Sequence, residues 1–228
     1  LNIICVSEWL ATQARKGILK RFPIHVIQNP VDTDEFYPVD KAEAKRELGI
    51  PPYKKTVLFS VAANPKDTRK GFDIICEALK QLDIQDLFLI PTSIASNSDA
   101  LEEVLEGRPS LPPRHLSTNE ELRLHYSAAD VVWHPTRADT SSMVGLEAIA
   151  CGTPIIAARV GGVPEVVQSG KGGILIEPEN PQALAEATKR HFKANQQSNN
   201  ILSVAPRHKL ANFVAASEAL YKQEYTLE

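Results

Sequence analysis

Short apolar runs alternate with amphipathic segments through most of the chain, and this alternation limits the folds that the sequence can adopt. The runs at 56–62, 87–90, 130–134, 154–157 and 173–176 are too short for ordinary helices and are typical of buried parallel strands. The segments between them carry apolar residues at helical spacing, and several begin with capping residues. Strands that alternate with helices predict an α/β fold, a Rossmann-like doubly wound parallel sheet with helices on both faces.

A break in this pattern divides the chain near its beginning. The runs at 2–6 and 24–28 predict two strands around a helix at 8–20, and residues 29–38 follow without any periodicity. The prolines of that last segment are typical of a linker or hinge, so we place a domain boundary there. The further elements are predicted as helices at 40–48, 72–82, 99–106, 118–128, 142–151, 164–168, 180–193 and 207–225, with a short strand at 114–116.

Charge and cysteine content exclude several classes of function. The 25 basic and 28 acidic residues leave a formal net charge of −3, so we expect no nucleic-acid partner. Cys5, Cys76 and Cys151 are far apart and odd in number, which suits buried thiols in a reducing cytosol better than disulfides or a metal cluster. No apolar run approaches the roughly 18 residues that span a bilayer. We therefore predict a cytoplasmic location and expect no metal.

Three loops follow strands at the carboxyl edge of the predicted sheet, where ligands of doubly wound folds bind: 63–71, 135–141 and 158–163. The first contains Arg69, Lys70 and Gly71. Two cations beside a glycine at a helix start suit a diphosphate, although a solvated charged loop has the same local sequence. Neither a P-loop nor a G-x-G-x-x-G dinucleotide pattern is present.

Two acidic residues stand out after the strand at 130–134. Asp139 precedes a predicted helix whose first turn offers hydroxyls and free amides, and it is interpreted either as a ligand-holding group or as an ordinary helix cap. Glu147 lies within an otherwise apolar helical run. A carboxylate in such a place needs a partner, either a lysine or a pair of hydroxyls such as those of a ribose.

Other polar residues give weaker signals. Gly161 and Gly162 fit either a turn or the close approach of a ligand. His134, Trp133 and His115 have no partners at catalytic or metal-binding spacing, which favours core or surface roles. No nucleophile triad and no G-x-S-x-G pattern is present.

The run from Pro135 to Glu165 resembles the signature of retaining GT-B glycosyltransferases of family 4, the glycosyl transferases group 1. The family pattern has an acidic residue, seven positions, Glu-Ala, an apolar pair, G-x-P and then a Gly-Gly loop followed by Glu. The matching residues here are Asp139, Glu147, Ala148, Gly152, Thr153, Pro154, Gly161, Gly162 and Glu165. Further similarity lies in Val6, Ser7, residues 29–32, Phe36, Pro38, residues 69–73, Tyr126, Ala129 and Asp130. The sequence departs from the pattern in having Asp139 where Glu followed by Gly-Phe-Gly is commoner, and Ala62-Ala63 in place of Gly-Arg.

The resemblance implies a role for each matching residue. Lys70, Asp139 and Glu147 would be the catalytic residues: Glu147 would bind the ribose, Asp139 the donor sugar and Lys70 the diphosphate. Pre-placed cations and amides would stabilise the departing diphosphate without a metal or other cofactor, and no enzymic nucleophile is expected. The remaining donor-binding residues would be Arg69, Thr140, Ser141, Ser142, Met143, Gly161 and Gly162.

The resemblance also implies a domain organisation. Residues 1–30 would be a remnant of the N-terminal GT-B domain and linker, 31–195 the nucleotide-sugar-binding Rossmann-like domain, and 196–228 a C-terminal loop and helix. The chain starts at Leu1 inside a strand-like run, so we expect a fragment of a longer protein. Residues 1–28 are then expected either to pack against this domain or another copy, or to be poorly ordered. The acceptor site would lie in the missing N-terminal domain, so the isolated chain is expected to bind its donor without turning it over.

The full-length enzyme is thus predicted to transfer a hexose from a nucleoside diphosphate sugar to an acceptor, with retention of anomeric configuration. Its acceptor, donor base, sugar and oligomeric state are not fixed by the sequence, and the resemblance allows peripheral membrane association. Two alternatives remain open. One is a non-catalytic nucleotide-binding module of the same fold, and the other is a nucleotide-sugar epimerase, which would need further acid/base groups across the cleft.

Overall fold

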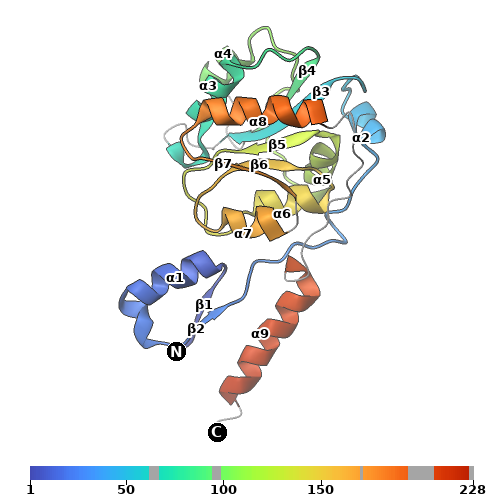
Figure 1. The fold of residues 1–228 in the computed structure, drawn as a ribbon. Coiled ribbons are helices and arrows are strands. Elements are labelled where there is room, and N and C mark those ends of the chain that lie inside the picture. The colour runs from blue at the N-terminus through green and yellow to red at the C-terminus, as the bar shows by residue number, and fades with distance from the viewer. Residues whose placement is uncertain (62–66, 94–98, 170–171, 195–207, 226–228) are drawn as a thin grey trace.

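A central parallel sheet organises the chain, as the computed structural model in Figure 1 shows, and residues 1–61, 67–93, 99–169, 172–194 and 208–225 are described. Its five strands lie in the order β4-β3-β5-β6-β7 and all pair in parallel. The strands are β3 (Lys55–Val61), β4 (Leu87–Ser93), β5 (Val131–His134), β6 (Ile155–Ala158) and β7 (Gly173–Ile176). The predicted α/β fold class is confirmed.

Helices cover both faces of this sheet. Alternate residues of a strand point to opposite faces, so Val57 and Phe59 belong to one hydrophobic cluster and Leu58 to another. Figure 1 shows α3, α4 and α8 above the sheet and α6 and α7 below it. The cluster of Val57 contains residues of α3 (Phe72–Lys80), α4 (Asp99–Leu105) and α8 (Pro181–Ala194). The cluster of Leu58 contains residues of α2 (Lys41–Glu47), α5 (Asn119–Ala128), α6 (Met143–Ala150) and α7 (Val163–Ser169).

Local capping signals set the helix starts as the sequence predicts. Thr118 accepts from the backbone of Glu121, whose carboxylate reaches back to the start of α5, and Asp40 caps α2. Several boundaries differ from the prediction: β4, for example, was expected to end at residue 90 and continues to Ser93. The helix expected at 8–20 ends at Lys16, because the backbone at Gly17 is extended and a short 3-10 helix follows. The strand expected at 114–116 is only an isolated bridge of Arg114 to Thr92.

The first residues form a small unit of their own, which we call the amino-terminal unit (residues 1–28). It pairs β1 (Ile3–Cys5) in parallel with β2 (Ile24–Val26) in a two-stranded sheet, with α1 (Glu8–Lys16) and the 3-10 helix η1 (Ile18–Arg21) between them. Figure 1 shows this unit and α9 (Leu210–Tyr225) on the same side of the sheet domain, residues 31–194. The expectation that residues 1–28 pack on the domain is consistent with contacts between the amino-terminal unit and α7.

Other sequence expectations have mixed outcomes. Cys5 and Cys151 are buried free thiols, whereas Cys76 is only partly buried because it lies on the outer side of α3. Within the described residues, none of the helices combines the length and apolar character that crossing a bilayer requires. The boundaries at residues 30 and 195 stay predictions, and residues 195–207 of the predicted C-terminal segment lie outside the described part of the chain.

Candidate functional site

The direction of the strand order changes between β3 and β5, which creates a crevice at the carboxyl edge of the sheet. From β3 the chain proceeds to β4 on one side, and β5 then returns to the other side of β3. Ligands of doubly wound folds bind at such switch points. The predicted loops 63–71 and 135–141 leave β3 and β5 at this crevice, although residues 63–66 of the first lie outside the described residues.

These two loops are bonded to each other through their backbones. The carbonyl of Arg69 accepts from the Arg137 amide at 2.7 Å and from the Thr136 hydroxyl at 2.9 Å. Gly71 has φ +68°, and a Cβ there would lie 2.1 Å from the carbonyl oxygen of Pro135. This glycine is therefore required by the close approach of the two loops, in addition to its place at the start of α3.

Arg137 fastens the same junction through its side chain, a role that the sequence interpretation missed. Its guanidinium donates to both carboxylate oxygens of Asp73 at 2.8 and 2.7 Å, to Glu179, and to the carbonyl of Thr68. The hydrogen bonds with Asp73 and Glu179 raise the pKa of Arg137. The only signal in the sequence was that Arg137 lies two residues before Asp139. Its contact with Asp73 could not be predicted, because the fold alone brings these two residues together.

The two predicted cations of the first loop differ in their engagement. Arg69 donates through Nε and Nη2 to the carboxylate of Asp67 at 2.9 and 2.8 Å, and this bond lowers the pKa of Asp67 to about 2. Among the described residues, the ammonium of Lys70 has no hydrogen bond or ion pair. Lys70 is therefore available to an anion, whereas Arg69 would first have to leave Asp67.

Asp139 is held at the crevice by two neighbours. Its Oδ1 accepts from the Ser141 amide at 3.0 Å, and its Oδ2 lies 3.1 Å from Nε2 of His134 at the end of β5. Burial works to raise the pKa of Asp139, but the His134 bond and charge, the Ser141 amide and the charge of Lys70 outweigh it, so the pKa lies below its ordinary value. His134 is buried, in line with the core role predicted for it, but the turn after β5 also brings Asp139 back to it, a contact that the sequence did not predict. Trp133 is a core residue, as predicted.

The first turn of α6 presents backbone amides beside Asp139. Ser142 is the N-cap, and its hydroxyl accepts from the Gly145 amide at 3.0 Å, so Asp139 is not the helix cap. The amides of Met143 and Val144 have no acceptor within the helix by its geometry. Ser141 and Ser142 are buried while Thr140 is exposed, so backbone amides and Thr140 are the accessible donors here.

Glu147 lies farther along α6 and makes a different contact. Its Oε2 accepts from the hydroxyl of Tyr126 on α5 at 2.9 Å, which supplies the partner that the sequence demanded. Burial raises the pKa of Glu147, and the Tyr126 bond only partly opposes this. Burial and the charge of Glu147 raise the pKa of Tyr126 well above its ordinary value. Glu147 therefore contacts Tyr126 rather than Lys70 or Asp139.

The glycine loop, Gly161 and Gly162, packs against the backbone that carries Asp139. The Gly162 amide donates to the Asp139 carbonyl at 3.0 Å. A Cβ on Gly161 would lie 1.9 Å from that same oxygen, and one on Gly162 would lie 2.1 Å from the Thr140 carbonyl oxygen. Both glycines are required by the approach of two backbones, so the loop holds the shape of the segment from Asp139 to Thr140.

Gly161→Ala is expected to lower the free energy of unfolding by about 2 kcal/mol more than Gly49→Ala, measured by urea unfolding. Both glycines have positive φ, +52° and +69°, so an alanine is conformationally strained at either position. Only Gly161 has a neighbouring atom within 4 Å of the added methyl group. Equal costs for the two substitutions would contradict the packing of the glycine loop against Asp139.

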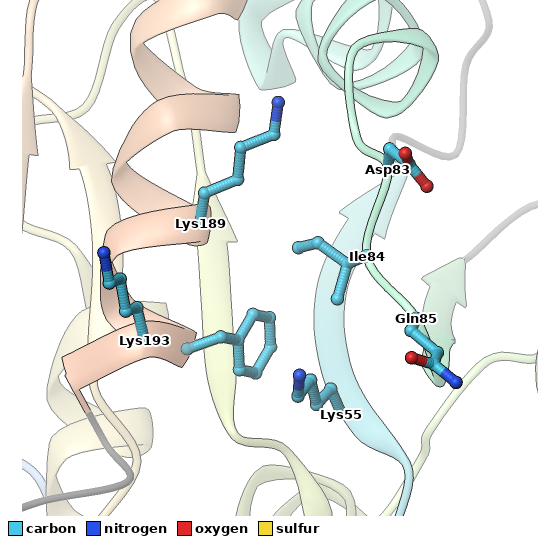
Figure 2. A pocket seen from close by; sticks show the side chains of 7 residues that line it. Lys55, Asp83, Ile84, Gln85, Lys189 and Lys193 are labelled. Atoms are coloured by element: carbon cyan, nitrogen blue, oxygen red, sulfur yellow. The ribbon is translucent and has the colours of Figure 1, made fainter.

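Among the described residues, two of the cavities lie away from Lys70 and Asp139. Figure 2 shows one of about 320 Å³ between Lys55, Asp83, Gln85, Lys189 and Lys193. Lys55 begins β3 and Gln85 precedes β4, so this cavity lies at the amino ends of the strands, opposite the crevice. The other, of about 510 Å³, lies between the amino-terminal unit, α7 and α9. Among the described residues, no group of three or more His, Cys, Asp or Glu side chains is placed to hold a metal ion.

Comparison with known sequences gives one consistent family. A family model described as Glycosyl transferases group 1 matches residues 54–193. D-inositol 3-phosphate glycosyltransferase 1 of Catenulispora acidiphila is 32% identical over 177 residues, which cover 72% of this chain and 42% of that protein. The D-inositol 3-phosphate glycosyltransferase of Mycobacterium sp. strain KMS is 34% identical over 164 residues, covering 68% and 36%. The matched region thus spans less than half the length of these relatives.

Solved structures share the fold. Sucrose-phosphate synthase of Thermosynechococcus elongatus superposes with a TM-score of 0.82 and 25% identity, covering 100% of this chain and 59% of that one. The HepE protein of Anabaena, solved in complex with UDP and glucose, superposes with a TM-score of 0.76 and 23% identity, covering 96% and 62%.

Proposed function

The chain belongs to the glycosyl transferases group 1 family, and from this premise we propose that it binds the nucleotide-sugar donor of a retaining GT-B glycosyltransferase. The observation that carries the proposal is the meeting of Lys70, Asp139 and the first turn of α6 at the switch point of the sheet. A cation without a hydrogen bond or ion pair among the described residues, the unbonded amides of the first turn of α6 and a carboxylate for hydroxyl groups suit a sugar diphosphate. The Anabaena HepE structure, which contains UDP and glucose, supports a uridine nucleotide as the first candidate.

Each residue has a proposed role. Lys70 binds the diphosphate and Asp139 the hydroxyls of the sugar. The amides of Thr140, Ser142 and Met143 bind the sugar and phosphate, while the Ser141 amide holds Asp139. Glu147 accepts from the two ribose hydroxyls through the carboxylate oxygens that Tyr126 leaves available. Gly161 and Gly162 keep the backbone of Asp139 and Thr140 in place. Arg69 assists after it exchanges Asp67 for the diphosphate.

These groups can stabilise the departure of a nucleoside diphosphate without a metal. Negative charge grows on the diphosphate as the bond to the sugar breaks, and Lys70 and the α6 amides are already oriented to receive it. Asp139 keeps its negative charge at neutral pH because its pKa is low, which suits it to accept from hydroxyls rather than to donate a proton. The acceptor then attacks on the face that the leaving group vacates, which gives retention.

Transfer of a hexose needs an acceptor site, and we propose that the remainder of the full-length enzyme supplies it. The matched region is 42% of the length of the Catenulispora relative, whose name states a D-inositol 3-phosphate acceptor for that protein. The chain is therefore proposed to bind its donor alone and to turn it over only with that remainder.

A thermal-shift panel of UDP, GDP and ADP, each alone and as its sugar conjugate, tests the proposal on the chain as it stands. A ligand that binds only the native state stabilises it by about 2.7 kcal/mol at a concentration of 100 times its Kd. We expect a rise of the midpoint with UDP and UDP-glucose. The absence of any shift across the panel would refute donor binding, and a shift with GDP or ADP alone would change the base.

Lys70→Ala is expected to weaken UDP binding about tenfold, because a charge-assisted contact with the diphosphate is lost. Uridine has no phosphate, so its Kd should change by no more than about twofold in the same variant. Lys189→Ala is the matched control, since Lys189 is exposed on α8 beside the cavity at the opposite edge of the sheet (Figure 2). Calorimetric Kd values for both ligands decide the result, and an equal loss for uridine and UDP would contradict a diphosphate contact.

A further inference from the structure

Glu165 makes contacts that the donor-binding roles do not use. It lies in the first turn of α7, immediately after the glycine loop. Its carboxylate accepts from the amides of Glu8 and Trp9 at 3.0 and 2.9 Å and from Nε2 of Gln28 at 2.9 Å. All three donors belong to the amino-terminal unit, so one carboxylate of the sheet domain reaches both α1 and the segment that follows β2.

The contact with α1 completes the amino end of that helix. Ser7 Oγ accepts from the Leu10 amide at 3.1 Å, and the Ser7 carbonyl accepts from the Ala11 amide at 3.0 Å. Glu165 takes the two remaining amides of the first turn, those of Glu8 and Trp9. A carboxylate at this position also interacts favourably with the helix dipole. The amino end of α1 is therefore capped jointly by Ser7 of the amino-terminal unit and Glu165 of the sheet domain.

The glycine loop is close both to Ser7, at the start of α1, and to the backbone of the proposed donor site. A Cβ on Gly162 would lie 3.0 Å from Cβ of Ser7 and 2.1 Å from the Thr140 carbonyl oxygen. Ser7 is buried against the loop. A displacement of α1 would therefore change the packing of Ser7 against the glycine loop, which contacts the backbone of Asp139 and Thr140.

Gln28, the last residue of the amino-terminal unit, bonds to the same carboxylate of Glu165. It follows β2 and precedes the linker, and its amide lines the cavity of about 510 Å³ together with Glu8, Glu165 and Phe213. Its Oε1 is buried and has no hydrogen-bond partner among the described residues, so the orientation of the side chain depends on the bond from Nε2 to Glu165. Glu165 is therefore bonded both at the start of α1 and at the end of the unit.

From these contacts we propose that Glu165 is a positioning residue, which fixes the amino-terminal unit against the glycine loop and transmits donor binding to α1. The contact itself stands on the hydrogen bonds above, whereas its link to the donor rests on the proposed function. In this role Glu165 sets the position of the acceptor-side part of the enzyme relative to the donor, without touching either substrate.

Hydrogen exchange of the backbone amides of Glu8 and Trp9 tests the proposal. Glu165→Ala removes all three bonds, and Glu165→Gln keeps the shape but loses the charge and one acceptor oxygen. In the ligand-free chain, we expect both amides to exchange about tenfold faster in Glu165→Ala and several-fold faster in Glu165→Gln. Peptides from β5 and β6 should exchange as in the wild type, which shows that the domain is folded. Glu186→Gln on α8 is the matched control and should change nothing.

Addition of UDP separates positioning from a merely structural contact. In the wild type, UDP should slow exchange at Glu8 and Trp9 further. In Glu165→Gln it should not, and calorimetry is expected to give a similar Kd of UDP for both proteins. Unchanged ligand-free exchange in both Glu165 variants would overturn the proposal. Binding of UDP with no effect on α1 in the wild type would overturn the transmitting role. If UDP binds neither the wild type nor any variant, the donor proposal is refuted. The exchange rates of the ligand-free proteins then decide whether Glu165 fixes the amino-terminal unit.

Discussion

Asp130→Asn is expected to lower the free energy of unfolding by about 3–5 kcal/mol, because it removes the charge that compensates a buried lysine. Asp130 accepts from Lys41 at 2.9 Å, from Lys45 at 3.0 Å, and from both the amide and the hydroxyl of Thr56 at 2.8 Å. Lys45 is only 4% exposed. Asparagine keeps one oxygen that can accept a hydrogen bond but carries no charge, so the buried ammonium of Lys45 would lose its compensating negative charge.

Urea unfolding of Asp130→Asn and Lys41→Ala distinguishes the buried pair from the surface pair. The Lys41 side chain is 42% exposed, so its removal should cost less than about 1 kcal/mol. Equal costs would contradict a structural role for the Asp130–Lys45 pair.

The same carboxylate predicts part of the acid sensitivity of the chain. Burial works to raise the pKa of Asp130, but the charges of Lys41 and Lys45 and the bonds from Thr56 outweigh it, so the pKa in the folded state is lowered. Its contribution is therefore present above the unfolded pKa of about 3.9 and is lost as the pH falls through the folded value. Unfolding midpoints measured from pH 6 downward should fall less steeply for Asp130→Asn than for the wild type.

Most of the fold could be predicted because periodicity and capping are local properties. The apolar runs became β3 to β7, and the capping pair Thr118–Glu121 began α5 where expected. The helix at 8–20 was predicted too long because the helical spacing of apolar residues continues through Ile18 and Leu19. In the structure the helix ends before Gly17, and the side chains of Ile18 and Leu19 are exposed. The strand order itself required the structure, since parallel strands pair through crossovers of many residues.

The candidate site was predicted as a set of loops but not as a set of contacts. The carboxyl edge of the sheet brings Lys70, Asp139 and the glycine loop together, as strand ends and loop positions indicated. The pairs His134–Asp139, Tyr126–Glu147 and Arg137–Asp73 were missed. The residues of the last two pairs are 21 and 64 positions apart, so no local pattern joins them. The first pair is only five positions apart, but it depends on the path of the turn after β5.

Glu147→Gln is expected to change stability and ligand binding in opposite directions. The proposed bonds from two ribose hydroxyls to the carboxylate are each worth about 1.5–3 kcal/mol, so the Kd of UDP should rise about 100-fold or more. Burial raises the pKa of Glu147, which means that the folded state favours the protonated form. The stability contribution of Glu147 therefore falls as the pH rises from the ordinary carboxyl pKa through the raised one, and at neutral pH the buried charge is a cost.

Glutamine removes that cost while it keeps an oxygen that can accept from Tyr126. The ligand-free thermal midpoint of Glu147→Gln at pH 7.5 should therefore equal or exceed that of the wild type, and the difference should shrink as the pH is lowered toward the ordinary carboxyl pKa. Glu186→Gln, an exposed substitution on α8, should change neither the midpoint nor the Kd. A Kd within about threefold of the wild type would remove Glu147 from the ribose site. A residue that is retained for binding can destabilise the ligand-free protein through its buried charge, which is why the midpoint of Glu147→Gln is not expected to fall. A lower ligand-free midpoint would instead show that the carboxylate stabilises the fold.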